Sequence, residues 1–322
     1  MHYSQSEKME IILLVERSDL GVIRTLRQLK VSKTTFYNWY NTYEKHGFDG
    51  LARRRGKRKE VWNKINLADR DKVVEIALER PELSSIELAW TITDKYNYYI
   101  SESSVYRILK LNGLVTTPSF RIMSASDSFK DKTTSVNQMW QTDFTYFKIV
   151  GWGWYFLSTI LDDYSRFIVN WKLCATMKAE DVKETIDEAL LVSQTKIPPK
   201  LLSDNGSCYV SHELADYLSD RNMKHVRGRP LHPQTQGKIE RYHRSMKNVV
   251  KLDNYYSPGQ LEDKMKEFVR YYNFERYHES INNLTPSEVY YGTGERKLKR
   301  RKRIKKQTLI DRKKQNCKIH LN

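Results

Sequence analysis

LLSDNG at residues 201–206 and HPQTQGKIER at residues 232–241 delimit the segment that decides the fold of this chain. The first stretch is an apolar run that ends in an acid and a turn, which is typical of a short buried strand. The second stretch is a loop marked by Pro and Gly that leads into a helix carrying Glu240. Upstream, WQTDFT at residues 140–145 places another acid, Asp143, inside a strand-like run. Carboxylates in such settings are suited to holding divalent metal against phosphate oxygens.

The pattern around these acids, between residues 137 and 256, predicts an α/β domain. Alternating and apolar runs predict strands at residues 139–149, 154–161, 167–173, 200–203 and 224–227. Amphipathic stretches predict helices at residues 180–193 and 212–221 and a long helix from about residue 235. We therefore expect a mixed five-stranded sheet flanked by helices. If the strand at 200–203 lies parallel to and beside the strand at 139–149, Asp143 and Asp204 meet at one edge of the sheet.

Residues 1–52 are expected to form a helix-turn-helix module. Apolar stripes predict helices at 7–17 and 21–29, and Ser32 is a suitable N-cap for a third helix that buries Phe36. Polar side chains lie near the start of that helix, where such a module contacts base edges, namely Lys33, Thr34, Thr35 and Asn38. The alternative is a three-helix bundle with another purpose.

A basic run, RRRGKRK at residues 53–59, lies within an expected linker at residues 53–66. Such a run is either a solvated connection or an arm that follows phosphates or a minor groove. In the second case Arg53, Arg54 and Arg55 contact DNA.

The helical pattern resumes at residues 67–115. Ser84 precedes Glu87 by three residues, which is the spacing of a capping box, and a further helix is expected to start after Ser101. The two helices repeat the spacing of the first module, so this second module either contacts DNA or serves only for packing. Residues 116–136 lose periodicity and are interpreted as a linker.

The carboxyl-terminal part and the composition complete the domain assignment. Residues 257–294 are expected to be helical, and the Lys- and Arg-rich residues 295–322 are expected to be a basic tail, disordered when free and associated with DNA when bound. With 12% aromatic residues the chain is expected to fold, and a net charge of +17 predicts a polyanionic partner. No apolar run approaches the roughly 18–20 residues of a membrane span, and the start, MHYSQ, does not resemble a signal peptide. Three scattered cysteines favour a reducing cytoplasm.

The acids are suited to a pair of divalent ions that clamps the attacking and leaving oxygens of a phosphoryl displacement. We expect two Mg²⁺ ions, with Mn²⁺ able to substitute, bridged by Asp143 and held individually by Asp204 and Glu240. Cations on the predicted helix of Glu240 are DNA-contacting candidates, namely Lys238, Arg244 and Lys247. Asp162 and Asp163 are interpreted as turn or capping residues.

WQTDFT, SDNG, PQTQGKIER and the 35 residues between Asp204 and Glu240 resemble the integrase core of bacterial insertion-sequence transposases. These transposases are relatives of retroviral integrases with an RNase H-like fold. YNFERYH at residues 272–278, followed by LTP at 284–286, is similar to the segment that closes that core. The resemblance covers roughly residues 137–292.

The resemblance implies that Asp143, Asp204 and Glu240 form the catalytic triad and that Lys247 contacts DNA. It also implies cleavage at the ends of the enzyme's own mobile element and joining of the 3′-hydroxyls to target DNA. The expected partners are double-stranded DNA, as terminal repeats and as target, and further copies of the chain, because two element ends must be cut together. A bacterial, nucleoid-associated location is expected.

Two other functions share features with a transposase. A sequence-specific DNA-binding regulator with an idle core would have the same basic surface, but it has no physical need for three converging carboxylates. A metal-dependent nuclease without joining activity, such as a ribonuclease H, has no need for upstream helix-turn-helix modules.

Overall fold

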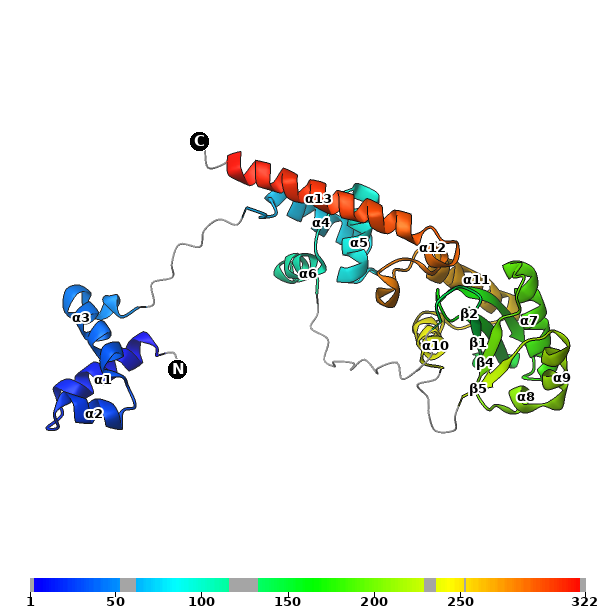
Figure 1. Ribbon diagram of the computed structural model, residues 1–322, viewed down its shortest axis with the longest axis horizontal. Helices are drawn as coiled ribbons and strands as arrows, with labels where there is room; N and C mark the ends of the chain where they lie inside the picture. The colour runs from blue at the N-terminus through cyan, green and yellow to red at the C-terminus, as the bar shows by residue number, and fades with distance from the viewer. Residues whose placement is uncertain (1–2, 53–61, 116–132, 229–235, 252, 319–322) are drawn as a thin grey trace. The chain divides into compact units, whose positions relative to one another are not determined.

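The computed structural model describes residues 3–52, 62–115, 133–228, 236–251 and 253–318 (Figure 1). The chain divides into two compact units, residues 1–64 and residues 65–322. The division lies within the linker expected at residues 53–66, of which residues 53–61 are outside the described part of the chain.

The amino-terminal unit consists of helices α1 (Gln5–Glu16), α2 (Val22–Gln28) and α3 (Lys33–Gly50). Ile12, Leu26 and Phe36 form its buried centre. The hydroxyl of Ser32 accepts the backbone N–H of Thr35, so it caps α3 as predicted. α3 is kinked at Gly47, where φ is +64°. The three predicted helices are confirmed.

The second unit begins with three helices, α4 (Leu67–Glu79), α5 (Ser85–Tyr96) and α6 (Glu102–Leu111). The predicted capping box is present, since the Ser84 hydroxyl accepts the N–H of Glu87 and the Glu87 carboxylate accepts the N–H of Ser84. Val73, Leu88 and Val105, one from each helix, pack together in a small core.

The sheet has five strands in the order β3-β2-β1-β4-β5. Their bounds are β1 Met139–Ile149, β2 Gly153–Asp162, β3 Ile168–Cys174, β4 Lys200–Ser203 and β5 His225–Arg227. β1 pairs antiparallel with β2 and parallel with β4, which confirms the predicted mixed sheet and the predicted neighbourhood of the first and fourth strands. This is the RNase H-like arrangement that the resemblance implies.

Helices cover both faces of the sheet because side chains along β1 and β2 alternate between two apolar cores. Trp140 and Ile160 pack against α7 (Ala179–Ser193), with α8 (Ser207–Val210) and α9 (His212–Asp220) in the same core. Phe147 and Leu157 face the opposite way, toward α10 (Gly237–Val250) and α11 (Pro258–Phe274). Asp143 precedes Phe147 by four residues on β1, so both side chains point to the same face of the sheet, the one covered by α10.

The carboxyl-terminal residues are ordered differently from the prediction. After a 3₁₀ turn (Glu279–Ile281) and α12 (Pro286–Tyr290), the expected disordered tail forms a 25-residue helix, α13 (Gly294–Lys318). α13 runs along α5 (Figure 1), and its buried Arg301 and Arg312 bond to Asp94 of α5 and to Tyr98, which follows α5. The expectation of disorder is wrong, because these cations find hydrogen-bond partners and need no solvent. Residues 67–115 are thereby held in the same compact unit as the sheet.

Candidate active site

Asp143 and Asp204 each accept a hydrogen bond from a nearby backbone N–H. Asp143 lies within β1, its side chain is 22% exposed, and its Oδ1 accepts the N–H of Phe144 at 2.8 Å. Asp204 follows the last residue of β4, and its Oδ1 accepts the N–H of Gly206 at 2.9 Å. A Cβ on Gly206 would lie 3.0 Å from that oxygen, so this turn requires glycine or a small shift. Each carboxylate therefore keeps its second oxygen for other partners.

The register of β1 and β4 brings these two acids to the same level. Gln141 lies opposite Leu202 in the parallel pair. Asp143 lies two residues after Gln141, and Asp204 lies two residues after Leu202. The pKa of the nearby Cys208 thiol is raised to about 11, mainly by burial. The negative charges of Asp204 and Asp143 add to this increase. The parallel pairing is the condition under which the sequence predicts that Asp143 and Asp204 meet, and the meeting itself stays a prediction.

Glu240 lies in the first turn of α10, exposed to solvent. One turn later on the same helix, the Nδ1 of His243 lies 3.3 Å from Oδ2 of Asp143, so α10 packs directly over the acid of β1. Among the residues that the structure describes, no group of three or more His, Cys, Asp or Glu side chains is arranged to hold a metal ion. The convergence of Glu240 on the two aspartates therefore stays a prediction.

Asp163 connects the strand of Asp143 to the helix of Glu240. Its buried carboxylate accepts hydrogen bonds from Gln141 Nε2 at 2.7 Å and Lys238 Nζ at 2.6 Å. The other end of the Gln141 amide accepts the N–H of Ile239 at 3.1 Å, in the first turn of α10. Gln141 precedes Asp143 by two residues and Lys238 precedes Glu240 by two, so this network sets how the two acid-bearing elements face each other.

The sequence predicts a turn or capping role for both Asp162 and Asp163. Asp162 acts as the turn cap it was predicted to be, accepting the N–H and hydroxyl of Ser165. Asp163 does more than close a turn, and Gln141 and His243 were not singled out. The available signals were spacing alone: Gln141 lies on the same strand face as Asp143, and His243 lies one helical turn after Glu240. Lys238, predicted to contact DNA, uses its ammonium inside the protein.

The other cations predicted on α10 border the acids. Lys247 lies 5.2 Å from the ring of Tyr146, and its pKa is lowered by burial and by Lys251, against the opposing effect of Asp143. Arg244 is exposed. A cationic face thus continues from Glu240 along the helix.

The predicted base-contacting residues of α3 differ in exposure. Lys33, Thr34 and Asn38 are exposed, whereas Thr35 is partly buried and bonds its hydroxyl to Ser32 at 2.7 Å. Arg53, Arg54 and Arg55 lie outside the described residues.

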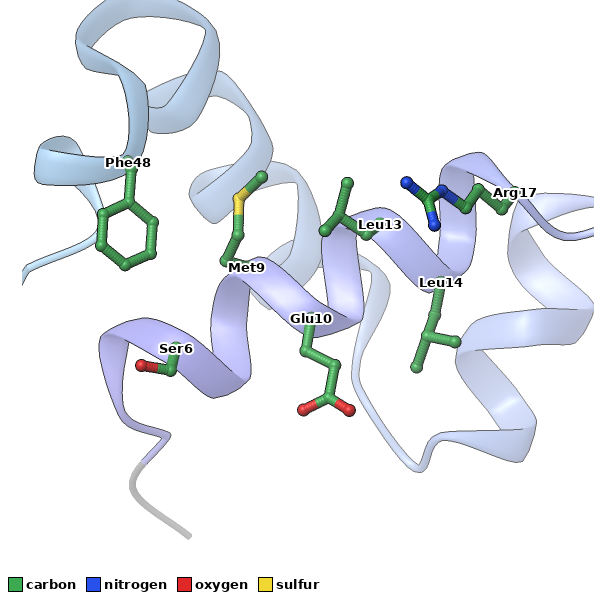
Figure 2. Close-up of a pocket in the computed structure, with 7 residues that line it drawn as sticks. All are labelled: Ser6, Met9, Glu10, Leu13, Leu14, Arg17 and Phe48. Atoms are coloured by element: carbon green, nitrogen blue, oxygen red, sulfur yellow. The ribbon is translucent and has the colours of Figure 1, made fainter.

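The amino-terminal unit also contains an open hollow of about 400 Å³ along α1. Met9, Leu13 and Leu14 of α1 and Phe48 of α3 give it an apolar lining (Figure 2). Glu10 and Arg17 add one charge of each sign. None of the acids discussed above belongs to this hollow.

Comparison with known families agrees with this architecture. Residues 133–233 and 221–286 match integrase core domain families. Residues 7–59 match a helix-turn-helix domain family, and residues 35–109 match a homeodomain-like domain family. The chain therefore contains an integrase core domain preceded by helix-turn-helix modules. This composition is consistent with an integrase-like transposase.

Curated relatives are retroviral polyproteins. The chain is 31% identical over 115 residues to the Gag-Pro-Pol polyprotein of Simian retrovirus SRV-1, which covers 35% of the chain and 6% of the polyprotein. It is also 31% identical over 129 residues to that of Mouse mammary tumor virus (strain BR6), covering 38% of the chain and 7% of the polyprotein. The chain thus matches only a small fraction of the length of these relatives.

Solved structures of integrase catalytic core domains are also similar. The HTLV-2 domain in complex with magnesium has a TM-score of 0.40 and 19% identity, covering 48% of this chain and 97% of that one. The BIV domain has a TM-score of 0.38 and 24% identity, covering 50% of this chain and 99% of that one.

In the described residues no helix is both long and apolar enough to cross a membrane.

Proposed function

We propose that this protein is a transposase that binds the terminal repeats of a mobile element, cleaves DNA phosphodiesters there and joins the 3′-hydroxyl ends to target DNA. The observation that carries the proposal is the parallel pairing of β1, which contains Asp143, with β4, which Asp204 directly follows, together with the contact between His243 of α10 and Asp143. The integrase core and helix-turn-helix families of the chain support the same reaction class.

Asp143, Asp204 and Glu240 are the proposed catalytic and metal-binding residues. Their oxygen ligands are those that Mg²⁺ and Mn²⁺ prefer, and two such ions, when bound, would stabilise the attacking and leaving oxygens of the phosphodiester. The backbone bonds from Phe144 and Gly206 hold one oxygen of each aspartate in place, and the second oxygen of Asp143 lies 3.3 Å from Nδ1 of His243. The donor chemistry therefore fits divalent metal.

DNA contacts are proposed at three places. In the first module, Lys33, Thr34, Thr35 and Asn38 would contact bases, and Arg53, Arg54 and Arg55 would follow the backbone. The second module, α4–α6, would extend the DNA site. Beside the acids, Arg244 and Lys247 would hold phosphates. The protein is proposed to act as a homo-multimer on DNA, because two element ends react together.

The proposal is tested by cleavage of a labelled linear duplex that carries the terminal repeat, with Mg²⁺ and with EDTA. Asp143→Asn, Asp204→Asn and Glu240→Gln should each reduce cleavage by more than about 100-fold, beyond the usual cost of losing an outer-sphere partner of a metal. Asp216→Asn, which changes an exposed acid of α9, is the matched control and should cleave normally.

The same assay separates the two leading functions. Metal-dependent nicking at the repeat boundary that requires the three acids supports the transposase. Tight binding to the repeat without cleavage would assign the chain to the class of DNA-binding regulators with an idle core. Full activity in Asp204→Asn would remove the proposed active site.

A further inference from the structure

Helix α1 of the amino-terminal unit has two apolar sides. Ile11, Ile12 and Val15 are buried in the centre of that unit. At about 100° of rotation per residue, Leu13 and Leu14 lie on the opposite side of the helix, and Leu14 is 48% exposed. A helix that meets only water on its outer side carries polar residues there. The outer side of α1 is therefore suited to a contact with another apolar surface.

The same outer side borders the hollow shown in Figure 2. Met9, Leu13 and Leu14 line it from α1 and Phe48 lines it from α3, and its volume is about 400 Å³. Phe48 is 47% exposed. Contiguous apolar side chains at a surface commonly mark an interaction site, so the hollow calls for a partner.

The charges on this side of α1 indicate which partner fits. Glu10 and Arg17 also line the hollow, and both are exposed. They are two helical turns apart, about 10 Å along the axis, which is too far for an ion pair within one helix. Leu13 and Leu14 lie midway between them. The order of acid, two leucines and base is complementary to itself when one copy is reversed.

A second copy of α1 in the antiparallel direction satisfies both features. A twofold axis between Leu13 and Leu14 places Glu10 opposite the partner's Arg17, and the same contact occurs again on the other side of the axis. The leucines of the two copies then meet at the axis and cover the hollow. A parallel pair would place like charges opposite each other. We propose that the outer side of α1 is a dimerisation surface on which two copies of this chain pack their α1 helices antiparallel.

The expected contact is small. α1 has 12 residues and is about 18 Å long, so the pairing is expected to be weak on its own. Copies held together elsewhere would raise the effective concentration of the two helices. The proposal deepens the proposed function, because it names one contact of the proposed homo-multimer. It requires neither DNA nor metal, so it can be tested without them.

Disulfide trapping in the full chain tests the direction of the pairing. The background is Cys317→Ser, since Cys317 is exposed whereas Cys174 and Cys208 are buried. Glu10→Cys and Arg17→Cys are made in separate chains and mixed. A disulfide needs Cα atoms within about 7 Å, and in the antiparallel pair position 10 lies opposite position 17 but about 10 Å along the axis from its own copy. Mild oxidation should therefore link the mixture at least about fivefold more than either variant alone.

Two controls accompany this experiment. Arg24→Cys mixed with Glu44→Cys removes the same two charge types from exposed positions of the same unit, outside the lining of the hollow, and measures random collisions. Leu14→Ser, added to both test chains, removes the apolar contact at the axis and should weaken the pairing about tenfold. Leu14 lies outside the buried centre of the unit, so this variant is expected to fold, which circular dichroism checks.

Linked dimers that form in the mixture and are lost with Leu14→Ser would support the antiparallel pairing. Linking of either variant with itself would mean that the helices are parallel, which overturns the proposal. Trapping at the level of the control pair, or trapping that Leu14→Ser leaves unchanged, would mean that the hollow has another occupant. The Asp143→Asn cleavage assay judges the proposed function separately, so failure of one proposal is distinguishable from failure of the other.

Discussion

Asp163 is a buried carboxylate whose partners come from two acid-bearing elements. It is 3% exposed and pairs with Lys238 at the start of α10 while accepting a hydrogen bond from Gln141 of β1. Because a buried charge without its partner is costly, both charges are expected to matter for the fold, and their geometry is expected to matter for the reaction.

Asp163→Asn should lower the free energy of unfolding by about 3–5 kcal/mol, because it breaks the ion pair between the buried Asp163 carboxylate and the Lys238 ammonium. Lys238→Met should lower the free energy of unfolding by a similar amount, because it removes the ammonium that pairs with the buried Asp163 carboxylate. The double variant removes both charges and should recover most of the stability, but cleavage should stay low because the Lys238–Asp163 link, which helps to position α10 against β1, is gone. Denaturant unfolding and repeat-end cleavage measure the two effects. Full cleavage by the double variant would show that Asp163 does not position the site.

Residue chemistry explains which parts of the site could be predicted. Asp143 lies within a strand and Asp204 directly follows one, and both strands have a readable pattern, so their parallel pairing could be predicted. Asp163 could not be assigned because its role depends on Lys238, 75 residues away. A cation in a sequence shows its charge but not its partner, and Lys238 was therefore interpreted as a DNA contact.

At the scale of elements, α13 is held against α5 by its own cations, which point toward α5 and bind its carboxylate Asp94. Asp94 of α5 accepts hydrogen bonds from Arg301 at 2.7 and 2.9 Å and lies 2.9 Å from the ammonium of Lys297. The hydroxyl of Tyr277, from the segment after α11, donates to the same carboxylate at 2.9 Å. One acid thus connects α5, α13 and the end of the integrase core domain.

The sequence predicted disorder here for a physical reason. Sequence patterns reveal a buried helix face when that face is apolar, but the inner face of α13 contains Arg301, Thr308 and Arg312 together with Ile304. Thr308 accepts the N–H of Tyr99, and Arg312 donates to the hydroxyl of Tyr98 and the carbonyl of Tyr99. Only the folded α4–α6 helices supply these partners.

We predict that Asp94→Asn releases α13. Repulsion among its neighbouring cations disfavours the isolated helix, and each like-charged pair one turn apart costs a few tenths of a kcal/mol. Without the Asp94 charge, Arg301 and Lys297 add to that repulsion. Amide hydrogen exchange in residues 297–312 should accelerate by at least about tenfold. Glu75→Gln, an exposed acid of α4, is the control and should leave exchange unchanged. Equal protection in both variants would refute the anchoring role of Asp94.

At the scale of the whole chain, the net charge of +17 is unevenly placed. The outer side of α13 displays exposed cations, among them Lys299, Lys302 and Lys306, at spacings of three and four residues. A helix of 25 residues is about 37 Å long, comparable with one turn of B-DNA. A duplex along this side would relieve the repulsion that the free helix carries.

The predicted DNA contact of α13 is measurable as a salt dependence. Log K for DNA falls with log salt by about 0.9 for each phosphate neutralised, so Lys299→Gln, Lys302→Gln and Lys306→Gln combined should flatten the slope by up to about 2.7. Lys196→Gln, Lys200→Gln and Lys224→Gln combined are the control. They remove the same charge near the amino ends of β4 and β5, away from Asp204. A flatter slope in the first variant alone assigns the contact to α13. Equal slopes in both variants would mean that the salt dependence of DNA binding reflects the overall charge of the protein and not a contact of α13.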